Sequence, residues 1–266
     1  MWADHRSSAG PSGVDGRMDR LGALVRHNAL LLRRDPGPVL SRLCMPVLLM
    51  VVFEPLYRAA AGTTGEIAIR DTAPRVLVTF SMFAVSTVGV TMIAERTWRT
   101  WSWLRATPAS AWELVAGKSV PLLGVLLVQQ VLVLGLARIA FGLSILAPPL
   151  LLFAGLAWAL CILACGVLLA TFAHSPTQLS SFADVGGLLL SSVGGALVPI
   201  TLMPAWLRDI APVSPAYWGV RALRAAVVGD GVATLAAVAV LLVLALAAGW
   251  LACWRINRHW SRPELL

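Results

Sequence analysis

The sequence predicts an all-α integral membrane protein with six transmembrane helices. Of its 266 residues, 58% are hydrophobic and only 13% are charged, whereas a soluble globular chain carries about 25% charged residues. It contains six apolar runs, each long enough at about 1.5 Å per residue to cross a hydrocarbon core of about 30 Å. A soluble helical fold is excluded because a chain of this length cannot bury so much apolar surface.

The N-terminal region is predicted to precede the first membrane span. Residues 1–17 are rich in Gly, Ser, Asp and Arg and have no apolar core typical of a signal peptide, so we expect a disordered cytoplasmic tail. In residues 18–34, apolar side chains such as Leu21 and Val25 recur three or four positions apart, with arginines largely elsewhere. This pattern predicts an amphipathic helix at the membrane interface, ended by the Pro and Gly residues of 35–38.

One transmembrane domain is predicted over residues 18–256, followed by a cytoplasmic tail at 257–266. The predicted spans are 39–57, 75–94, 119–140, 147–173, 184–202 and 232–254. The first is the weakest, because it contains Pro46 and Pro55 and because Arg42 and Glu54 shorten its apolar centre.

The distribution of basic residues predicts the orientation. Alternate sides of the predicted spans carry 14 and 7 Lys and Arg residues. The positive-inside rule therefore places both termini and residues 95–118 in the cytoplasm, and residues 203–231 outside. The net charge of +8 is attributed to this bias and to membrane lipid headgroups rather than to nucleic acid.

The most informative segment is the basic and aromatic stretch between the second and third spans. A chain this apolar would be expected to re-enter the bilayer by a shorter route. Its tryptophans are explained equally well as interfacial anchors or as part of a surface that binds a partner. Its distinctive residues are Glu95, Arg96, Trp98, Arg99, Trp101, Trp103, Leu104, Arg105 and Pro108.

A second long segment lies between the fifth and sixth spans. Residues 198–218 are too rich in proline for one spanning helix and too apolar for a free loop. We therefore expect short re-entrant helices that dip into the outer leaflet, with aromatic side chains at the interface. The residues that define this outer region are Pro199, Pro204, Trp206, Pro215, Tyr217 and Trp218.

Few polar residues lie within the spans. Such side chains face protein or water rather than lipid, so they either line a substrate path or form interhelical hydrogen bonds, and we favour the second reading for the glutamines. The candidates for the path are Ser86, Thr87, Gln129, Gln130, Ser191 and Ser192. The Gly pairs 186–187 and 194–195 indicate close helix packing, either inside the chain or in a dimer.

The sequence carries no recognisable catalytic motif, so we do not expect an enzyme. Gly117-Lys118-Ser119 resembles the end of a Walker A motif, but Trp112 stands where that motif needs its first Gly. Cys161 and Cys165 lack the ligand spacing of a metal site, so we expect no metal and no cofactor in this chain.

Two other classes of membrane protein fit these patterns less well. A gradient-driven secondary transporter or channel is the alternative reading, and it predicts a charged group at mid-membrane. Glu54 and Asp184 lie near the ends of their runs instead. An intramembrane enzyme would need an Asp, His or Ser-His cluster at depth.

Two stretches resemble ABC-2 type permeases. The first runs from Glu95-Arg96-Thr97 through Thr107-Pro108 to Gly117-Lys118, and the second runs from Pro199 to Ala222-Leu223-Arg224. The resemblance covers roughly residues 18–256. It is greatest to drug-export permeases of the daunorubicin/doxorubicin-resistance type, which also implies an actinobacterial origin.

The resemblance implies an exporter of the plasma membrane. Two copies of a separate ATP-binding subunit, which would hold ATP and magnesium, are expected to dock on residues 95–113 and on the 18–34 helix. The distinctive residues at 95–108 would then form a cytoplasmic coupling helix. A second permease subunit, identical or different, is expected to complete the transporter. The usual Gly-Thr of the family is replaced by Arg99-Thr100 among tryptophans, which predicts a dedicated ATPase partner.

Overall fold

A computed structural model describes residues 15–34, 37–61, 66–97 and 111–260, and within these residues the chain contains helices and no strand. This confirms the all-α prediction. The α-helices are α1 (Asp15–Arg34), α2 (Gly37–Ala61), α3 (Glu66–Met82), α4 (Ala84–Thr97), α6 (Ala111–Phe141), α7 (Pro148–Ala170), α8 (Pro176–Val193), α9 (Ala205–Ile210), α10 (Pro215–Val227) and α11 (Gly231–Trp260). Two short 3-10 helices, η1 (Ile200–Leu202) and η2 (Ala211–Val213), flank α9.

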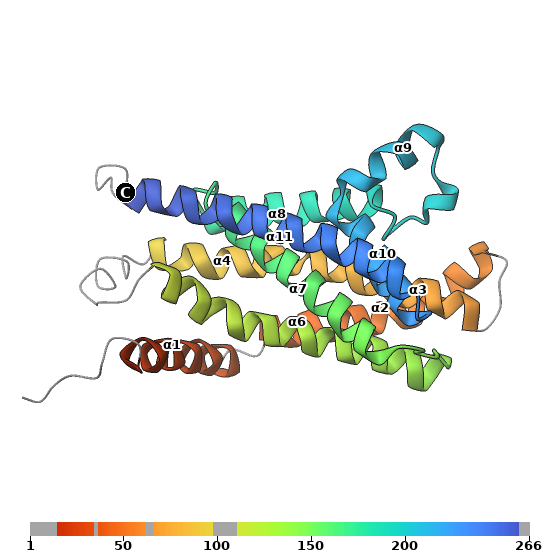
Figure 1. Cartoon of the computed structure of the whole chain (residues 1–266), viewed down its shortest axis with the longest axis horizontal. Helices are drawn as coiled ribbons and strands as arrows, with labels where there is room; N and C mark the ends of the chain where they lie inside the picture. Colours follow the sequence, from red (N-terminus) through yellow and green to blue (C-terminus); the bar gives the residue numbers. More distant parts are fainter. Residues whose placement is uncertain (1–14, 35–36, 62–65, 98–110, 261–266) are drawn as a thin grey trace, which may run out of the picture.

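The long helices lie side by side along the longest axis of the molecule (Figure 1). Four segments are long and apolar enough to cross a membrane, namely Ala68–Ile93, Ala116–Phe141, Pro148–Ala170 and Gly231–Ile256. Helix α2 contains a shorter apolar stretch, Leu43–Leu56, and α8 is more polar in its first turns. Both nevertheless pack along the other long helices, and the count of six spans stays a prediction.

The second span begins earlier than the sequence predicted. It runs from Ala68 through a break at Phe83, where α3 ends and α4 begins. The charged side chains before residue 75 were predicted to lie in a loop, but they lie within the helix, and the membrane boundary of this span stays a prediction. In the structure Asp71 and Arg75 lie on the first turns of the span and bind each other, so their charges do not end the helix.

Helix α8 overlaps the fifth predicted span, but it begins and ends earlier along the chain. Helix α8 starts at Pro176 rather than at residue 184, because the Ser175 hydroxyl accepts a hydrogen bond from the backbone N–H of Gln178 at 3.1 Å and caps the helix. It ends at Val193 rather than at residue 202, because Gly195 takes the left-handed conformation with φ of +80°. Sequence hydropathy missed both signals.

The segment after α8 forms the short helices that the sequence predicted, while its depth in the membrane stays a prediction. The Ser214 hydroxyl caps α10, accepting from the backbone N–H of Ala216 at 3.2 Å and donating to the carbonyl of Leu190 at 2.7 Å. Helix α10 then packs against α3, α7 and α11. Gly219 allows this approach, since a Cβ there would lie 2.7 Å from the ring of the fully buried Trp158.

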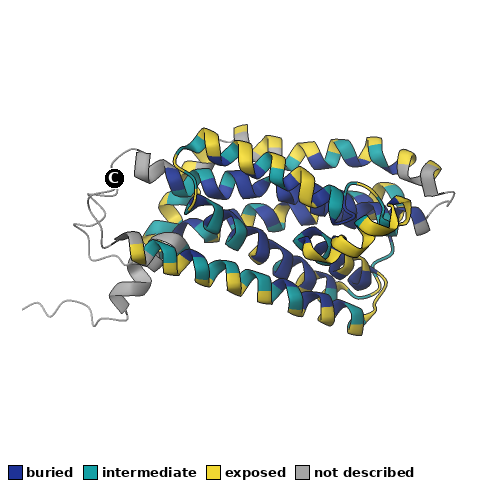
Figure 2. Cartoon of the chain, turned by 90° about the horizontal axis from the view of Figure 1, so that it is seen from above, coloured by how far each residue is buried: buried dark blue, intermediate teal, exposed yellow. Residues whose placement is uncertain are grey.

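The surface of the bundle is apolar along much of its length. Figure 2 shows buried residues on the inward sides of the helices and exposed ones on their outer sides. Large apolar side chains are among the most exposed, including Val131, Ile139, Leu246 and Trp250. Such a surface suits contact with lipid rather than water.

Candidate functional site

The candidate sites lie at the two ends of the bundle. Helix α1, the end of α4, the start of α6 and the end of α11 gather at one end, called here the α1 end (Figure 1). Helix α9, the end of α6 and the start of α11 lie at the other, called here the α9 end. The segments predicted to face the cytoplasm therefore share one end of the molecule.

At the α1 end, α1 packs closely on the first turns of α6. A Cβ on Gly117 would lie 2.8 Å from the Cβ of Leu24, so no larger residue fits at Gly117 without moving α1. The arginines of α1, such as Arg26 and Arg33, are exposed. Leu24 thus faces α6 while Arg26 and Arg33 face outward, and the predicted place of this helix at the membrane interface stays a prediction.

Lys118 joins the two helices that flank residues 98–110. Its side chain is only 8% exposed, and Nζ donates a hydrogen bond to the backbone carbonyl of Thr91 at 2.5 Å. A buried ammonium group is costly unless it is paired or hydrogen-bonded. The bond therefore ties the last turns of α4 to the first turns of α6, an arrangement that the Gly117-Lys118 motif did not reveal in the sequence.

The predicted coupling residues lie mostly beyond the described part of the chain. Glu95 and Arg96 fall in the last turn of α4. Those outside the described residues are Trp98, Arg99, Trp101, Trp103, Leu104, Arg105 and Pro108. The predicted coupling helix therefore stays a prediction, while both of its flanks are placed at the α1 end.

Among the predicted substrate-path residues, both glutamines are buried. Gln130 Nε2 donates to the backbone carbonyl of Gly155 at 3.0 Å and thereby joins α6 to α7. A Cβ on Gly155 would clash with Oε1 of Gln130, so the absence of a side chain there makes room for the amide. This is the interhelical hydrogen bond that the sequence analysis favoured.

The serine and threonine residues predicted along the substrate path differ in their burial and in their hydrogen bonds. Ser86 is buried in α4 and Thr87 beside it is half-buried. Ser192 donates to the carbonyl of Leu188 within its own helix at 2.8 Å. Ser191 is fully buried, and its hydroxyl has no hydrogen-bond partner among the described residues. A buried polar atom without a partner calls for an explanation, so Ser191 is the hydroxyl best placed for an interior polar contact.

The glycines of α8 and the turn after it are explained largely by packing inside the chain. A Cβ on Gly187 would lie 3.5 Å from Met82, and one on Gly194 would lie 2.7 Å from the backbone nitrogen of Tyr217. A Cβ on Gly186 would meet nothing within 4 Å. Of the two sequence readings, internal packing therefore holds for Gly187 and Gly194.

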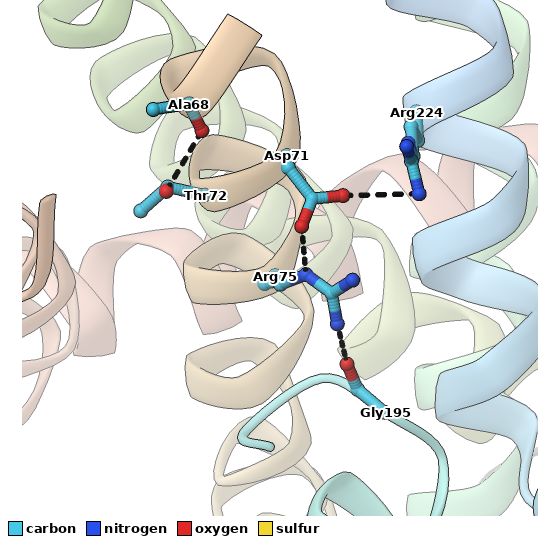
Figure 3. A network of polar contacts seen from close by, with 6 residues as sticks. All are labelled: Ala68, Asp71, Thr72, Arg75, Gly195 and Arg224. Atoms are coloured by element: carbon cyan, nitrogen blue, oxygen red, sulfur yellow. Dashed lines mark hydrogen bonds and ion pairs between the residues drawn. The ribbon is translucent and has the colours of Figure 1, made fainter. Parts of the chain in front are cut away.

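The α9 end holds a charge network that the sequence analysis missed. Asp71 lies between two arginines (Figure 3): its Oδ2 is 2.7 Å from Nε of Arg75, and its Oδ1 is 3.1 Å from Nη1 of Arg224. Arg75 also donates through Nη1 to the backbone carbonyl of Gly195. The network joins α3, α10 and the turn after α8. The contact with Arg224 is an ion pair without hydrogen-bond geometry, so Asp71 Oδ1 has no hydrogen-bond donor within the described part of the chain.

A cavity of about 300 Å³ lies beside this network. It is lined by Arg75, Ile200, Tyr217, Val220, Arg221, Arg224, Ala225 and Val228. In the sequence analysis, the three arginines were counted as orientation charges, with Arg224 also in the Ala222-Leu223-Arg224 motif, and they were not brought together in one site. The available signal was their spacing, because Tyr217, Arg221 and Arg224 follow one another at intervals of four and three residues and so share one face of a helix.

Comparison with known families supports the sequence resemblance. The profile of the family described as ABC-2 type transporter matches residues 19–228. The match extends from α1 through the whole of α10 and so includes both candidate sites. No curated protein matches the chain significantly.

Proposed function

The chain belongs to the ABC-2 type transporter family, as the permease component that associates with an ATP-binding subunit, and we propose that it exports a hydrophobic or amphiphilic substrate across the plasma membrane. Candidate substrates are a drug, a lipid, a glycolipid or a polyketide. Two permease subunits, identical or different, pair with two ATP-binding subunits that hold ATP and magnesium. The α1 end faces the cytoplasm.

The observation that carries this proposal is the packing at the α1 end. The contact of Gly117 with Leu24 joins α1 to α6, and the Lys118 bond to Thr91 joins α6 to α4. Force applied by a docked subunit to residues 98–110 or to α1 would therefore reach two long helices together. A rigid connection of this kind is what a permease driven from outside the membrane requires.

The transport cycle follows from this connection. Six spans are proposed, with α2 as the first and α8 as the fifth, beside the four longer apolar segments. ATP-driven closure of the partner subunits shifts the helices between inward-open and outward-open states, each of which has a different affinity for the substrate. The buried Ser191 hydroxyl, Ser86 and Thr87 are the polar positions proposed along the path.

The partner is proposed to be a dedicated ATPase. Trp98, Arg99 and Trp101 make this coupling segment bulkier than the Gly-Thr pattern of the resembled permeases. Replacement of the native ATPase by one from a related transporter should abolish most ATP-driven transport. Full transport with the substitute would contradict a dedicated partner.

A gradient-driven transporter or channel is the alternative, and the described residues favour it less. A gradient-coupled protein typically places an ionisable group near mid-membrane. The buried charges Glu54 and Lys118 lie close to the ends of their apolar segments, and Arg75 lies about two turns inside its segment, where it is paired with Asp71. Their positions suit helix ties better than an ion path.

Affinity purification of the full chain from its native membrane, followed by mass spectrometry, tests the proposed function. We expect a P-loop ATPase to be recovered in stoichiometric amounts. An intact oligomer of the chain that contains no ATPase would contradict the proposal. Transport that follows a proton gradient without ATP would then support the gradient-driven alternative.

A further inference from the structure

We propose that the cavity at the α9 end binds the oxyanion head group, a phosphate or carboxylate, of an amphiphilic molecule. As a statement about the exported substrate, it rests on the export function proposed above. The binding itself depends only on residues of this chain.

The cavity carries an excess of positive charge. Arg75, Arg221 and Arg224 line the cavity, and Asp71 is the carboxylate that contacts two of them. Among the described residues, the carboxylate of Asp230 forms no ion pair with these arginines; its Oδ1 instead accepts a hydrogen bond from the backbone N–H of Ala233 in α11 at 3.0 Å. The site therefore carries about two positive charges beyond those that Asp71 offsets. An anion in the cavity would relieve their mutual repulsion.

Side-chain hydrogen-bond donors lie along α10. Tyr217, Arg221 and Arg224 lie on the face of α10 that lines the cavity. The Arg221 guanidinium lies 5.6 Å from the ring centre of Trp218, and its Nη1 is 3.5 Å from the Tyr217 hydroxyl. Stacking on Trp218 restricts Arg221 while leaving most of its donors available. Arginine binds phosphate and carboxylate groups through two parallel hydrogen bonds.

Part of the cavity wall is apolar. Ile200, Val220, Ala225 and Val228 complete the lining. The volume of about 300 Å³ lies at the lower limit of small-molecule sites, which measure about 300–1,000 Å³. The cavity is therefore suited to a charged head group with its first carbon atoms, and it disfavours a cationic molecule.

A purely structural role accounts for only part of the cluster. Arg75, with 5% exposure, ties α3 to Gly195 and to Asp71, and Arg224 completes the pair with Asp71. Arg221 contributes to neither contact. A structural tie therefore does not explain why Arg221 lines the same cavity. Substitution of Arg221 can distinguish a structural role of the cluster from a role in anion binding.

The test uses the full chain in phosphatidylcholine nanodiscs, without an ATP-binding subunit or nucleotide. Fluorescent phosphatidic acid serves as the anionic probe, and fluorescent phosphatidylcholine as the zwitterionic one. The variants are Arg221→Gln, Arg224→Gln and the exposed control Arg138→Gln, which lies in the last turn of α6 and outside the cavity. Each cavity variant should weaken phosphatidic acid binding about tenfold, the size expected for a charged hydrogen bond.

Each outcome decides the proposal. Wild-type preference for phosphatidic acid, kept in Arg138→Gln and lost in Arg221→Gln, supports it. Equal binding by Arg221→Gln and Arg138→Gln overturns it, even if Arg224→Gln fails to fold. If inorganic phosphate competes as strongly as the lipid, the free ion is the ligand, and the proposal of an amphiphilic ligand is overturned. Because no ATPase is present, failure here leaves the recovery of an ATPase partner as a separate result.

Discussion

The two ends of the bundle use the same device for different purposes. At each end a buried cation donates to a backbone carbonyl of another segment, Lys118 to Thr91 at the α1 end and Arg75 to Gly195 at the α9 end. Lys118 lies beside a close contact between two helices, whereas Arg75 lines a cavity with two more arginines. The surroundings of a buried charge, rather than the charge itself, therefore distinguish a contact that ties helices together from a binding site.

The largest effect on stability is expected from Arg75→Met. Its removal leaves Asp71 without its 2.7 Å partner and frees the turn at Gly195. Breaking a buried ion pair from one side costs about 3–5 kcal/mol, and the partial exposure of Asp71 places the loss near the lower limit. Denaturant unfolding in detergent measures it, with the exposed Arg138→Met as control. Equal stability of the two variants would contradict a structural tie at this end.

The next effect is expected at Gly219, which seats α10 and so positions the cavity. Gly219→Ala places a methyl group 2.7 Å from the Trp158 ring and should destabilise the protein by about 1–3 kcal/mol through overpacking. Gly124→Ala is the matched control, because a Cβ there meets nothing within 4 Å and alanine favours the helix. Thermal unfolding compares them, and a stable Gly219→Ala would argue against a tight seat for α10.

Lys118→Met should cost less than Arg75→Met. The substitution keeps most of the side-chain volume and removes the hydrogen bond to the carbonyl of Thr91, so we expect a loss of about 1.5 kcal/mol. Coupling should suffer more than folding, because α4 and α6 are no longer tied. Unfolding and substrate-stimulated ATP hydrolysis measured on one preparation separate the effects. Unchanged stimulation would exclude Lys118 from the joint.

The smallest effect on stability is expected from Arg221→Gln. Its side chain is exposed and forms a weak contact with Tyr217 and a cation–π contact with Trp218, so the free energy of unfolding should change by about 1 kcal/mol or less. Thermal unfolding beside Arg224→Gln checks this value. A large loss for Arg221→Gln would mean that this arginine also supports the fold and would remove the contrast between it and Arg75.

The sequence predicted features that depend on local pattern. The α1 helix was expected at 18–34 and is found at Asp15–Arg34. The proline-rich segment after α8 forms short helices as expected. Gln130 forms the favoured interhelical bond. Each of these follows from periodicity, from proline or from the cost of an unpaired polar group in an apolar bundle.

The remaining features depend on contacts between distant parts of the chain. Arg75 and Gly195 are 120 positions apart. A local sequence pattern therefore could not show that they are in contact, or that Arg75 belongs to a helix rather than to a loop. The same limit applies to Asp71 and Arg224. The ends of α8 were missed for a local reason, because hydropathy ignores the Ser175 cap and the left-handed Gly195.

The central claim is that a separate ATPase drives the chain through the α1 end. The most direct test is the substrate-stimulated ATPase activity of the complex purified with its native ATP-binding subunit. Trp101→Ala is compared with Trp250→Ala, which removes an exposed tryptophan from the apolar surface of α11. We expect stimulation to fall about tenfold in Trp101→Ala and to persist in Trp250→Ala. Equal stimulation in both variants would contradict coupling through this end.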